Sequence, residues 1–393
     1  MISVGEADDV SLVNEITVAI PRLVYNSFNR TEYMFKNLLI VILIFTGLGA
    51  SVDSSFGQKF TLHLGKKNWI TQLQFTKDSK YLIGAGISST VGKWDVESRK
   101  EIWTLDLDAN SRAGNKYTIS EISDLDVSAD GDLVAVSYRQ STVVGDTVQG
   151  EEIFPIALID AKTGQILKKL LRRPTPKAAE NVSFSPDATR LLSSVYSDNV
   201  AILWNVKTGN EELKVNLKSP GCSIKFTPSG QEFVTACGIE AYEKWNDPKK
   251  SDIRLYDLKT GDVVREFPRY YRNVTGIDFS EDGKYLILST SAGIGLATIR
   301  TWDLQNNIKT LPENLLHQDE DTVQHQVLSS DRKLLAYATL DWRNGIVVAR
   351  YIDGKGPNRV FKTVGDVVTL AFSPNSHYLA VGKRGGKILV FKL

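Results

Sequence analysis

Residues 125–136 read LDVSADGDLVAV, and this pattern decides the fold of the chain. Apolar and polar residues alternate up to Val127, a short polar segment interrupts them, and the alternation resumes at Leu133. An alternation with a period of two is typical of a half-buried β-strand, and Asp-Gly between two such runs is typical of a tight turn. The stretch therefore predicts a β-hairpin, and Asp130-Gly131 suits the positive backbone angles of a primed hairpin turn.

The same pattern occurs seven times along the chain. The other copies are LQFTKDSKYLIG (73–84), VSFSPDATRLLS (182–193), IKFTPSGQEFVT (224–235), IDFSEDGKYLIL (277–288), HQVLSSDRKLLA (325–336) and LAFSPNSHYLAV (370–381). Self-similarity with a period of roughly 40 to 50 residues is the signature of a repeat architecture. The sequence therefore predicts seven related units, each beginning with a hairpin.

A second pattern follows each hairpin and predicts two more strands per unit. An alternating strand ends in an aromatic or branched residue, and a polar turn, often Lys-Thr-Gly, leads to a fourth strand. The seven copies are VGKWDVESRK (91–100), ALIDAKTGQIL (157–167), ILWNVKTGNEEL (202–213), IRLYDLKTGDVV (253–264), IRTWDLQNNIKT (299–310), VARYIDGKGPN (348–358) and ILVFKL (388–393).

These repeats resemble those of the WD-repeat β-propeller family. The Trp-Asp or Trp-Asn pair of that family stands at Trp94-Asp95, Trp204-Asn205 and Trp302-Asp303. The resemblance covers residues 58–393 and implies an all-β, seven-bladed β-propeller whose strands run from a at the axis to d at the rim. The Gly-His pair that precedes strand a in the family is missing, and Ile159, Tyr256, Tyr351 and Phe391 replace the third-strand Trp. The His-to-Trp hydrogen-bond network of the family is therefore not implied.

The seventh unit lacks a fourth strand, because the sequence ends at Leu393 after the third. An uncovered strand edge would leave backbone donors and acceptors unpaired. The segment KFTLHL, at about residues 59–64, is the natural partner. We therefore expect the N-terminal strand to pair with the C-terminal blade and to close a single domain.

An apolar run, Leu38–Ala50, precedes the repeats and predicts export. As a helix it would reach only about 20 Å, whereas a bilayer core is roughly 30 Å thick. Lys36 precedes the run and Ser55-Phe56-Gly57 follows it, which is the order typical of a secretory signal peptide. We expect Met34 to be the working start, residues 34–57 to be the signal peptide and residues 1–33 to be an extension absent from the mature protein. An uncleaved membrane anchor over residues 38–50 and a buried core segment are the alternatives.

Loop lengths predict a binding face. In a propeller, the loops from strand b to c and from one blade to the next emerge at the same end, and the extra length of this chain is concentrated there. Aromatic residues and arginines, which are enriched at binding hot spots, gather in those loops. They are Tyr138, Arg139, Arg172, Arg173, Tyr242, Trp245, Arg269, Tyr270, Tyr271, Arg272 and Trp342. The alternative is that these side chains pack only against their own loops.

No motif for catalysis, a metal or a cofactor emerges. His63, His317, His325 and His377 lie in different repeats without the spacing of metal ligands. The Lys-Thr-Gly turns resemble those of quinone-cofactor propellers, but Lys168, Leu213 and Arg265 replace the Trp found four residues after the Gly. The sequence contains neither a phosphate-binding Gly-rich loop nor a nucleophile elbow. We therefore expect no metal and no cofactor.

The two cysteines flank the hairpin of the fourth blade. If Phe226 pairs with Phe233, the register places Cys222 opposite Cys237, where a disulfide can form in an oxidising compartment. Two small apolar residues in a core are the alternative.

Charge excludes some partners. Lys and Arg number 47 against 46 Asp and Glu, so no net field attracts nucleic acid or an anionic membrane surface. We expect a monomeric, non-catalytic, exported WD-repeat propeller, periplasmic or secreted, that is a scaffold for protein partners, touching a membrane only if residues 38–50 remain as an anchor. The alternative is a propeller hydrolase or lactonase-like enzyme with polar residues at the axial mouth.

Overall fold

The computed structural model describes most of one compact unit, Asp53–Leu393. The described residues are 59–65, 69–108, 116–144, 147–148, 153–170, 179–195, 199–218, 222–237, 253–267, 273–280, 282–291, 298–304, 323–339, 344–352 and 356–393. They contain β-strands and turns but no helix, and so none that could cross a membrane. The predicted signal segment 34–57 and the extension 1–33 lie outside them.

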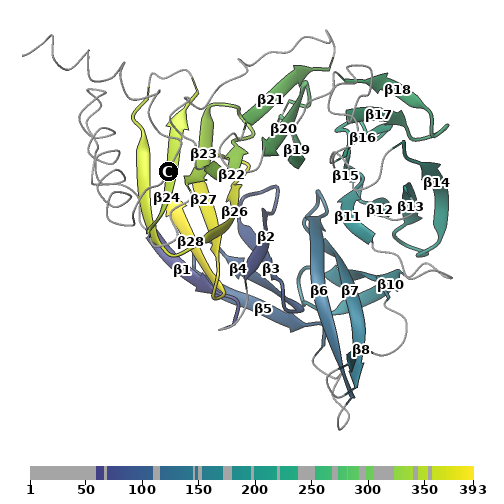
Figure 1. The fold of residues 1–393 in the computed structure, drawn as a ribbon, viewed down its shortest axis with the longest axis horizontal. Helices are drawn as coiled ribbons and strands as arrows, with labels where there is room; N and C mark the ends of the chain where they lie inside the picture. Colours follow the sequence, from purple (N-terminus) through teal and green to yellow (C-terminus); the bar gives the residue numbers. More distant parts are fainter. Residues whose placement is uncertain are drawn as a thin grey trace, which may run out of the picture. The chain divides into compact units, whose positions relative to one another are not determined.

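The strands form seven antiparallel sheets, which are the seven predicted blades (Figure 1). Blade 1 contains β2 (Ile70–Phe75), β3 (Tyr81–Gly86), β4 (Thr90–Asp95) and β5 (Lys100–Asp106), and blade 2 contains β6 (Lys116–Val127), β7 (Leu133–Val144), β8 (Thr147–Val148), β9 (Ile156–Asp160) and β10 (Ile166–Leu170). Blade 3 contains β11 (Ala179–Phe184), β12 (Arg190–Val195), β13 (Val200–Asn205) and β14 (Glu211–Asn216), and blade 4 contains β15 (Cys222–Phe226), β16 (Glu232–Cys237), β17 (Ile253–Asp257) and β18 (Val263–Glu266). Blade 5 contains β19 (Asn273–Phe279), β20 (Tyr285–Ser291) and β21 (Thr298–Asp303), and blade 6 contains β22 (Val323–Leu328), β23 (Leu334–Thr339), β24 (Asn344–Tyr351) and β25 (Arg359–Val364). Blade 7 contains β26 (Val367–Phe372), β27 (Tyr378–Lys383), β28 (Lys387–Lys392) and β1 (Lys59–His63).

The prediction of an all-β, seven-bladed propeller is confirmed. The fourth strand of blade 5, expected after Leu304, lies outside the described residues. Neighbouring blades meet mainly through their first strands, β2 with β6, β6 with β11, β11 with β15, β15 with β19, β22 with β26 and β26 with β2. Blades 5 and 6 meet through β20 and β22. The first strands therefore surround the axis of the ring.

The apolar core lies between successive blades, because each strand alternates its side chains between the two faces of its sheet. Trp94 of blade 1, for example, packs with Leu62, Leu64 and Val390 of blade 7 and is only 2% exposed. In blade 3, the indole Nε1 of Trp204 donates a hydrogen bond to Ser193 Oγ at 2.9 Å. A Trp-to-Ser bond is thus present in this blade although the Gly-His pair of the family is absent.

The hairpin turns repeat one arrangement, seen at Ser128. Its hydroxyl donates to Asp130 and accepts the N–H of Leu133 at 2.9 Å, and Asp130 accepts the N–H of Asp132 at 3.1 Å. Within this turn only Gly131 has a positive φ, +76°, and its N–H donates to the carbonyl of Ser128. The predicted primed turn is therefore wrong. The loop spans residues 129–132, two residues more than in a primed turn, and the left-handed Gly131 within it turns the chain toward the next strand.

The first and last described strands close the ring, as predicted. β1 pairs antiparallel with β28 from Lys59 opposite Phe391 to His63 opposite Lys387. Beyond the strand, the N–H of Leu64 donates to the carbonyl of Gly386 at 2.8 Å. Because Leu62 and Leu64 are buried between blades 7 and 1, the closing strand contributes both backbone pairing and apolar core.

The end of the ring that bears the a–b and c–d turns, here called the turn face, is tied together by contacts between neighbouring blades. Ser330 Oγ of blade 6 donates to the carbonyl of Pro374 in blade 7, and the N–H of Asn375 donates to Ser79 Oγ in blade 1. Trp103 of blade 1 lies directly on Gly164 of blade 2, where a Cβ would come within 2.7 Å of the indole ring. This leaves no room for a side chain at Gly164.

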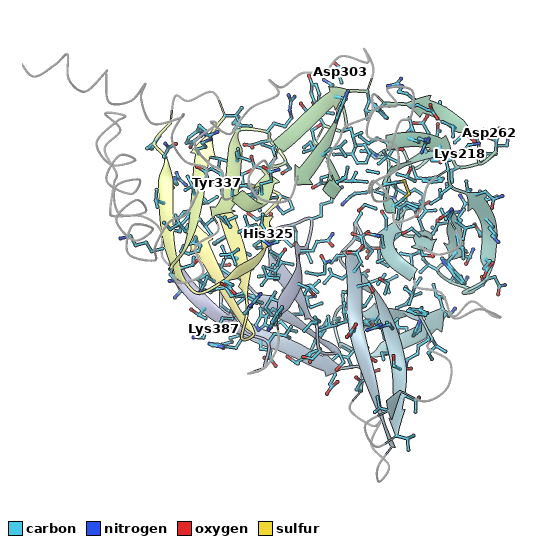
Figure 2. All side chains as sticks on the ribbon, in the orientation of Figure 1. Lys218, Asp262, Asp303, His325, Tyr337 and Lys387 are labelled. Carbon is cyan, nitrogen blue, oxygen red and sulfur yellow. A yellow bond between two sulfur atoms is a disulfide. The ribbon has the colours of Figure 1, made fainter. Side chains whose placement is uncertain are left out.

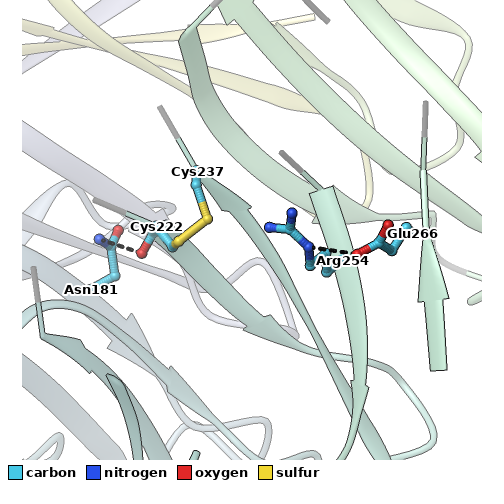
Figure 3. The surroundings of a disulfide bond; sticks show 5 residues. All are labelled: Asn181, Cys222, Cys237, Arg254 and Glu266. Carbon is cyan, nitrogen blue, oxygen red and sulfur yellow. Dashed lines mark hydrogen bonds and ion pairs between the residues drawn. A yellow bond between two sulfur atoms is a disulfide. The ribbon is translucent and has the colours of Figure 1, made fainter. Parts of the chain in front are cut away.

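The cysteines of blade 4 stand opposite each other in the β15–β16 register, as predicted, and their sulfur atoms are bonded (Figure 3). Both residues are buried in the core between blades 3 and 4. The side-chain amide of Asn181 in blade 3 donates to the carbonyl of Cys222 at 3.3 Å. The bond therefore joins the start of β15 to the end of β16, within the core that blade 4 shares with blade 3.

Truncating a buried side chain of the closing strand should destabilise the fold. We expect Leu62→Ala to lower the free energy of unfolding by about 2 to 5 kcal/mol, because it leaves a cavity between blades 7 and 1. Thr61→Ala, on the exposed side of the same strand, should change it by less than about 0.5 kcal/mol. Urea unfolding of both variants measures this, and equal losses would contradict the assigned role of the strand.

Protein isolated from its native compartment should contain no free thiol when it is denatured without reductant. Reduction should then lower the free energy of unfolding by about 3 kcal/mol on the chain-entropy model, since the bond spans 15 residues. The double variant Cys222→Ala/Cys237→Ala is the control, because its stability should not respond to reductant. Two titratable thiols in the native material would show that the bond does not form there.

Candidate functional site

The opposite end of the ring bears the b–c connections and the connections between blades, and is here called the loop face. Strand a starts at this end and strand b returns to it, because the a–b hairpins turn at the other end. The sequence places the binding residues on the loop face. Of the predicted residues, only Tyr138 and Arg139 are among those described. Those outside are Arg172, Arg173, Tyr242, Trp245, Arg269, Tyr270, Tyr271, Arg272 and Trp342.

Tyr138 is not a surface residue, and its assignment to a binding face is wrong. Its side chain is completely buried in the core between blades 1 and 2, among residues that include Ile122 and Val136. Burial raises the pKa of its hydroxyl, and the ammonium group of Lys169 lies 5.8 Å from its ring centre. A partner could not reach this side chain without opening the core.

Arg139 lies on a strand instead of a loop. It pairs with Glu121 across the β6–β7 ladder and forms an ion pair with it, and its side chain remains 42% exposed. β6 and β7 extend well past the neighbouring blades in Figure 1, and β8 adds a short third strand to this ribbon. The b–c connection of blade 2 and the connection that precedes this blade are therefore partly β-structure, and Arg139 is exposed beside its ion-pair partner Glu121.

A patch on the loop face that the sequence did not single out lies between blades 7 and 1. Trp69, directly before β2, is 41% exposed, and the guanidinium of Arg384 lies 4.0 Å from its ring centre. Arg384 also forms a 3.0 Å ion pair with Asp366. Ile87, 40% exposed, donates its N–H to the carbonyl of Trp69 at 3.0 Å. We call Trp69, Ile87, Asp366 and Arg384 the Trp69 patch.

Ring closure assembles this patch, because Arg384 follows the second strand of blade 7 and Trp69 precedes the first strand of blade 1. The two residues form an isolated bridge between the blades. The sequence signal that could have revealed it is a tryptophan at the start of the first repeat, combined with a basic b–c loop in the last. Neither signal points to the other unless the order of blades round the ring is considered.

Charged side chains also gather on the first strands, which surround the axis. The position before the last residue of the strand is Asp126 in blade 2, Lys225 in blade 4 and Asp278 in blade 5. Two residues earlier stand Asp124 in blade 2 and His325 in blade 6, which Figure 2 labels near the centre of the ring. The alternative prediction is an enzyme with polar residues at the axial mouth, and these inner strands do carry charged residues.

The axial carboxylates bond to neighbouring blades. Asp126 accepts the N–H of Phe184 at 2.7 Å and the side-chain amide of Gln74 at 2.9 Å, and Asp124 accepts the N–H of Val182 at 3.1 Å. The carboxylate of Asp278 lies 3.5 Å from Lys225 Nζ. Asp126 is only 8% exposed, whereas the side chain of Asp278 is 63% exposed. Asp278 is thus the carboxylate that solvent reaches most readily.

Burial and neighbouring charges shift the pKa values of these residues. Burial raises the pKa of Asp124 to about 7 and also raises the pKa of Asp126. The carboxylate of Asp278, with those of Asp126 and Asp124, raises the pKa of Lys225. Burial lowers the pKa of His325. In the part of the chain that the structure describes, no cluster of three or more His, Cys, Asp or Glu residues could hold a metal ion.

Known proteins resemble the chain over parts of its length. No protein-family model matches it. Pre-mRNA-processing factor 17 of Homo sapiens is 26% identical over 222 residues, which cover 55% of this chain and 35% of that protein. An uncharacterized WD repeat-containing protein of Synechocystis sp. is 24% identical over 213 residues, covering 50% and 53%. Subunit I of eukaryotic translation initiation factor 3 from Aspergillus oryzae is 22% identical over 349 residues, covering 83% and 92%.

The match therefore spans about a third of the length of the human relative. Among solved structures, the β-propeller domain of Cps50 (Swd1) from Myceliophteria thermophila shares the fold with a TM-score of 0.61 and 16% sequence identity, covering 86% of this chain and all of that domain. The repeat signatures, the seven blades closed by β1, and relatives that include a protein described by its WD repeats lead to one conclusion. The chain is a seven-bladed β-propeller whose repeats are similar to those of WD-repeat proteins.

Proposed function

We propose that this protein is a non-catalytic scaffold that binds a protein partner through its loop face. The exposed Trp69 patch is the observation that carries this proposal. Tryptophan and arginine dominate binding hot spots, because they combine a large contact area with directional polar groups. Here the Asp366 carboxylate holds the Arg384 guanidinium against Trp69, so little side-chain freedom would be lost on binding.

The relatives support the same class of function. One of them is named as a subunit of a translation initiation factor, and a subunit binds the other members of its assembly. Propellers suit this role, since their blades form a rigid frame on which loops can vary. The predicted arginines and aromatics of the other loops would extend the same face, with the propeller acting as a monomer.

We also propose that the protein is exported, to the periplasm or outside the cell. The apolar run Leu38–Ala50 between Lys36 and Ser55-Phe56-Gly57 supports this, and so does the position of Cys222 opposite Cys237. Retention of residues 38–50 as a membrane anchor is the alternative. Free thiols in native material, the outcome that contradicts the disulfide prediction, would count against either form of export.

Removing the Trp69 patch should weaken partner binding. The immobilised chain is exposed to extract of its own cells, and the retained proteins are quantified. We expect Trp69→Ala/Arg384→Ala to retain its partner at least tenfold less than the unmodified chain, as for a hot spot of about 2 kcal/mol. Leu167→Ala is the control, because Leu167 is 57% exposed on the outer strand of blade 2. Equal retention by all three proteins would contradict the assignment of the patch.

A second candidate is an enzyme of the hydrolase or lactonase type with an axial site, and the axial carboxylates favour it specifically. Asp278 is the best candidate for contact with a substrate, because it is exposed and beside Lys225. On this reading, Asp278→Asn would abolish turnover of a panel of esters and lactones by the purified protein. If the unmodified protein turns over none of them, the scaffold is favoured.

A further inference from the structure

Two carboxyl groups on the first strand of blade 2 fasten the inner edges of three blades. Asp124 and Asp126 together accept the N–H groups of Val182 and Phe184 in blade 3, and Asp126 also accepts the amide of Gln74 in blade 1. β11 is the edge strand of its sheet, and an edge strand presents backbone donors that need a partner. The carboxyl groups supply that partner.

Nearby positive charge does not fully compensate the negative charge of Asp124 and Asp126 when both are ionised. Of the strands that contact β6, β7 places the uncharged Ser137 and Ala135 opposite the two carboxyl groups. β2 contributes the neutral amides of Gln72 and Gln74, and β11 contributes backbone N–H groups. Lys225 on β15 is the cation that acts on both carboxyl groups, but Asp278 on β19 also bonds to it. When Asp124 and Asp126 are both ionised, three carboxylates therefore share one ammonium group.

We propose that Asp124 and Asp126 form a proton-dependent fastener between blades 2 and 3. The fastener holds the inner edge of blade 3 most tightly while the pair keeps one proton, because closure with both groups ionised buries a second negative charge. The stronger hydrogen bond that ionised Asp124 accepts from Val182 offsets only part of that cost. Two interacting carboxyl groups on one strand lose their protons in separate steps, because ionisation of the first disfavours ionisation of the second. This inference goes beyond the proposed function and does not depend on it.

The direction of the pH effect follows from the raised pKa of Asp124. The folded protein keeps this proton up to about pH 7, whereas an exposed aspartate loses it near pH 4. Between these values the folded form binds more protons, so closure of the fastener weakens as the pH rises. His325, whose pKa is lowered, contributes stability that is lost as the pH falls, which is the opposite slope. Variants must therefore be compared with the unmodified protein at each pH.

Hydrogen exchange at the Val182 and Phe184 amides measures directly how often the fastener opens. After correction for the intrinsic exchange rate, we expect their protection to fall about tenfold from about pH 6 to about pH 8 in the unmodified protein. In Asp124→Asn the fall should be less than about twofold, because the amide oxygen still accepts the Val182 N–H but cannot ionise. Asp262→Asn, at an exposed turn of blade 4 labelled in Figure 2, should retain the full fall.

The proposal is overturned if protection in the unmodified protein does not change with pH, or if Asp124→Asn shows the same fall. Should that variant fail to fold, the carboxyl carbon of Asp124 can be titrated by NMR in the unmodified protein. A midpoint near 7 supports the fastener, and a midpoint near 4 refutes it. Loss of partner binding in the Trp69 variants would leave either result unchanged, so the two proposals fail separately.

Discussion

The pairing of β1 with β28 is the interaction on which the rest of the structure depends. Each blade is a small sheet that buries its faces only against its neighbours. A ring that did not close would therefore leave the apolar faces of its first and last blades exposed. The closing strand supplies blade 7 with its fourth strand, and it also sends Leu62 and Leu64 into the core that covers Trp94 of blade 1. The Trp69 patch follows from the same closure, because it joins residues of the first and seventh blades.

Polar contacts at the inner edge help to hold blades that lack the His-to-Trp network of the family. Asp126 accepts the N–H of Phe184, and Ser183 in the next blade accepts the N–H of Phe226 in the blade after it. These contacts repeat one geometry with different side chains: a residue one position before the end of the first strand reaches the backbone of the following blade. The repeats can therefore diverge in their third strand and still remain in register.

The sequence predicts the features that depend on its periodicity, but it does not predict those that depend on contacts between different blades. Blade number, closure and the opposition of Cys222 and Cys237 follow from alternation and register alone. The assignment of Tyr138 to a loop is wrong because β7 continues to Val144 and keeps the side chain of Tyr138 on the same buried face as Val134 and Val136. The Trp69 patch and the fastener each join blades that are distant or separate in the sequence, so no local pattern reveals them.

The contacts across the turn face also restrict how the chain can change. A residue inserted into the hairpin turn at Ser330 or into the one at Pro374 would separate the hydroxyl and carbonyl groups that join blades 6 and 7. A residue inserted beside Gly164 would likewise disturb its contact with the indole of Trp103. The opposite end has fewer such ties among the described residues, and its connections differ in length from blade to blade. New recognition surfaces can therefore arise at one end of this propeller by simple lengthening, while the other end preserves the frame.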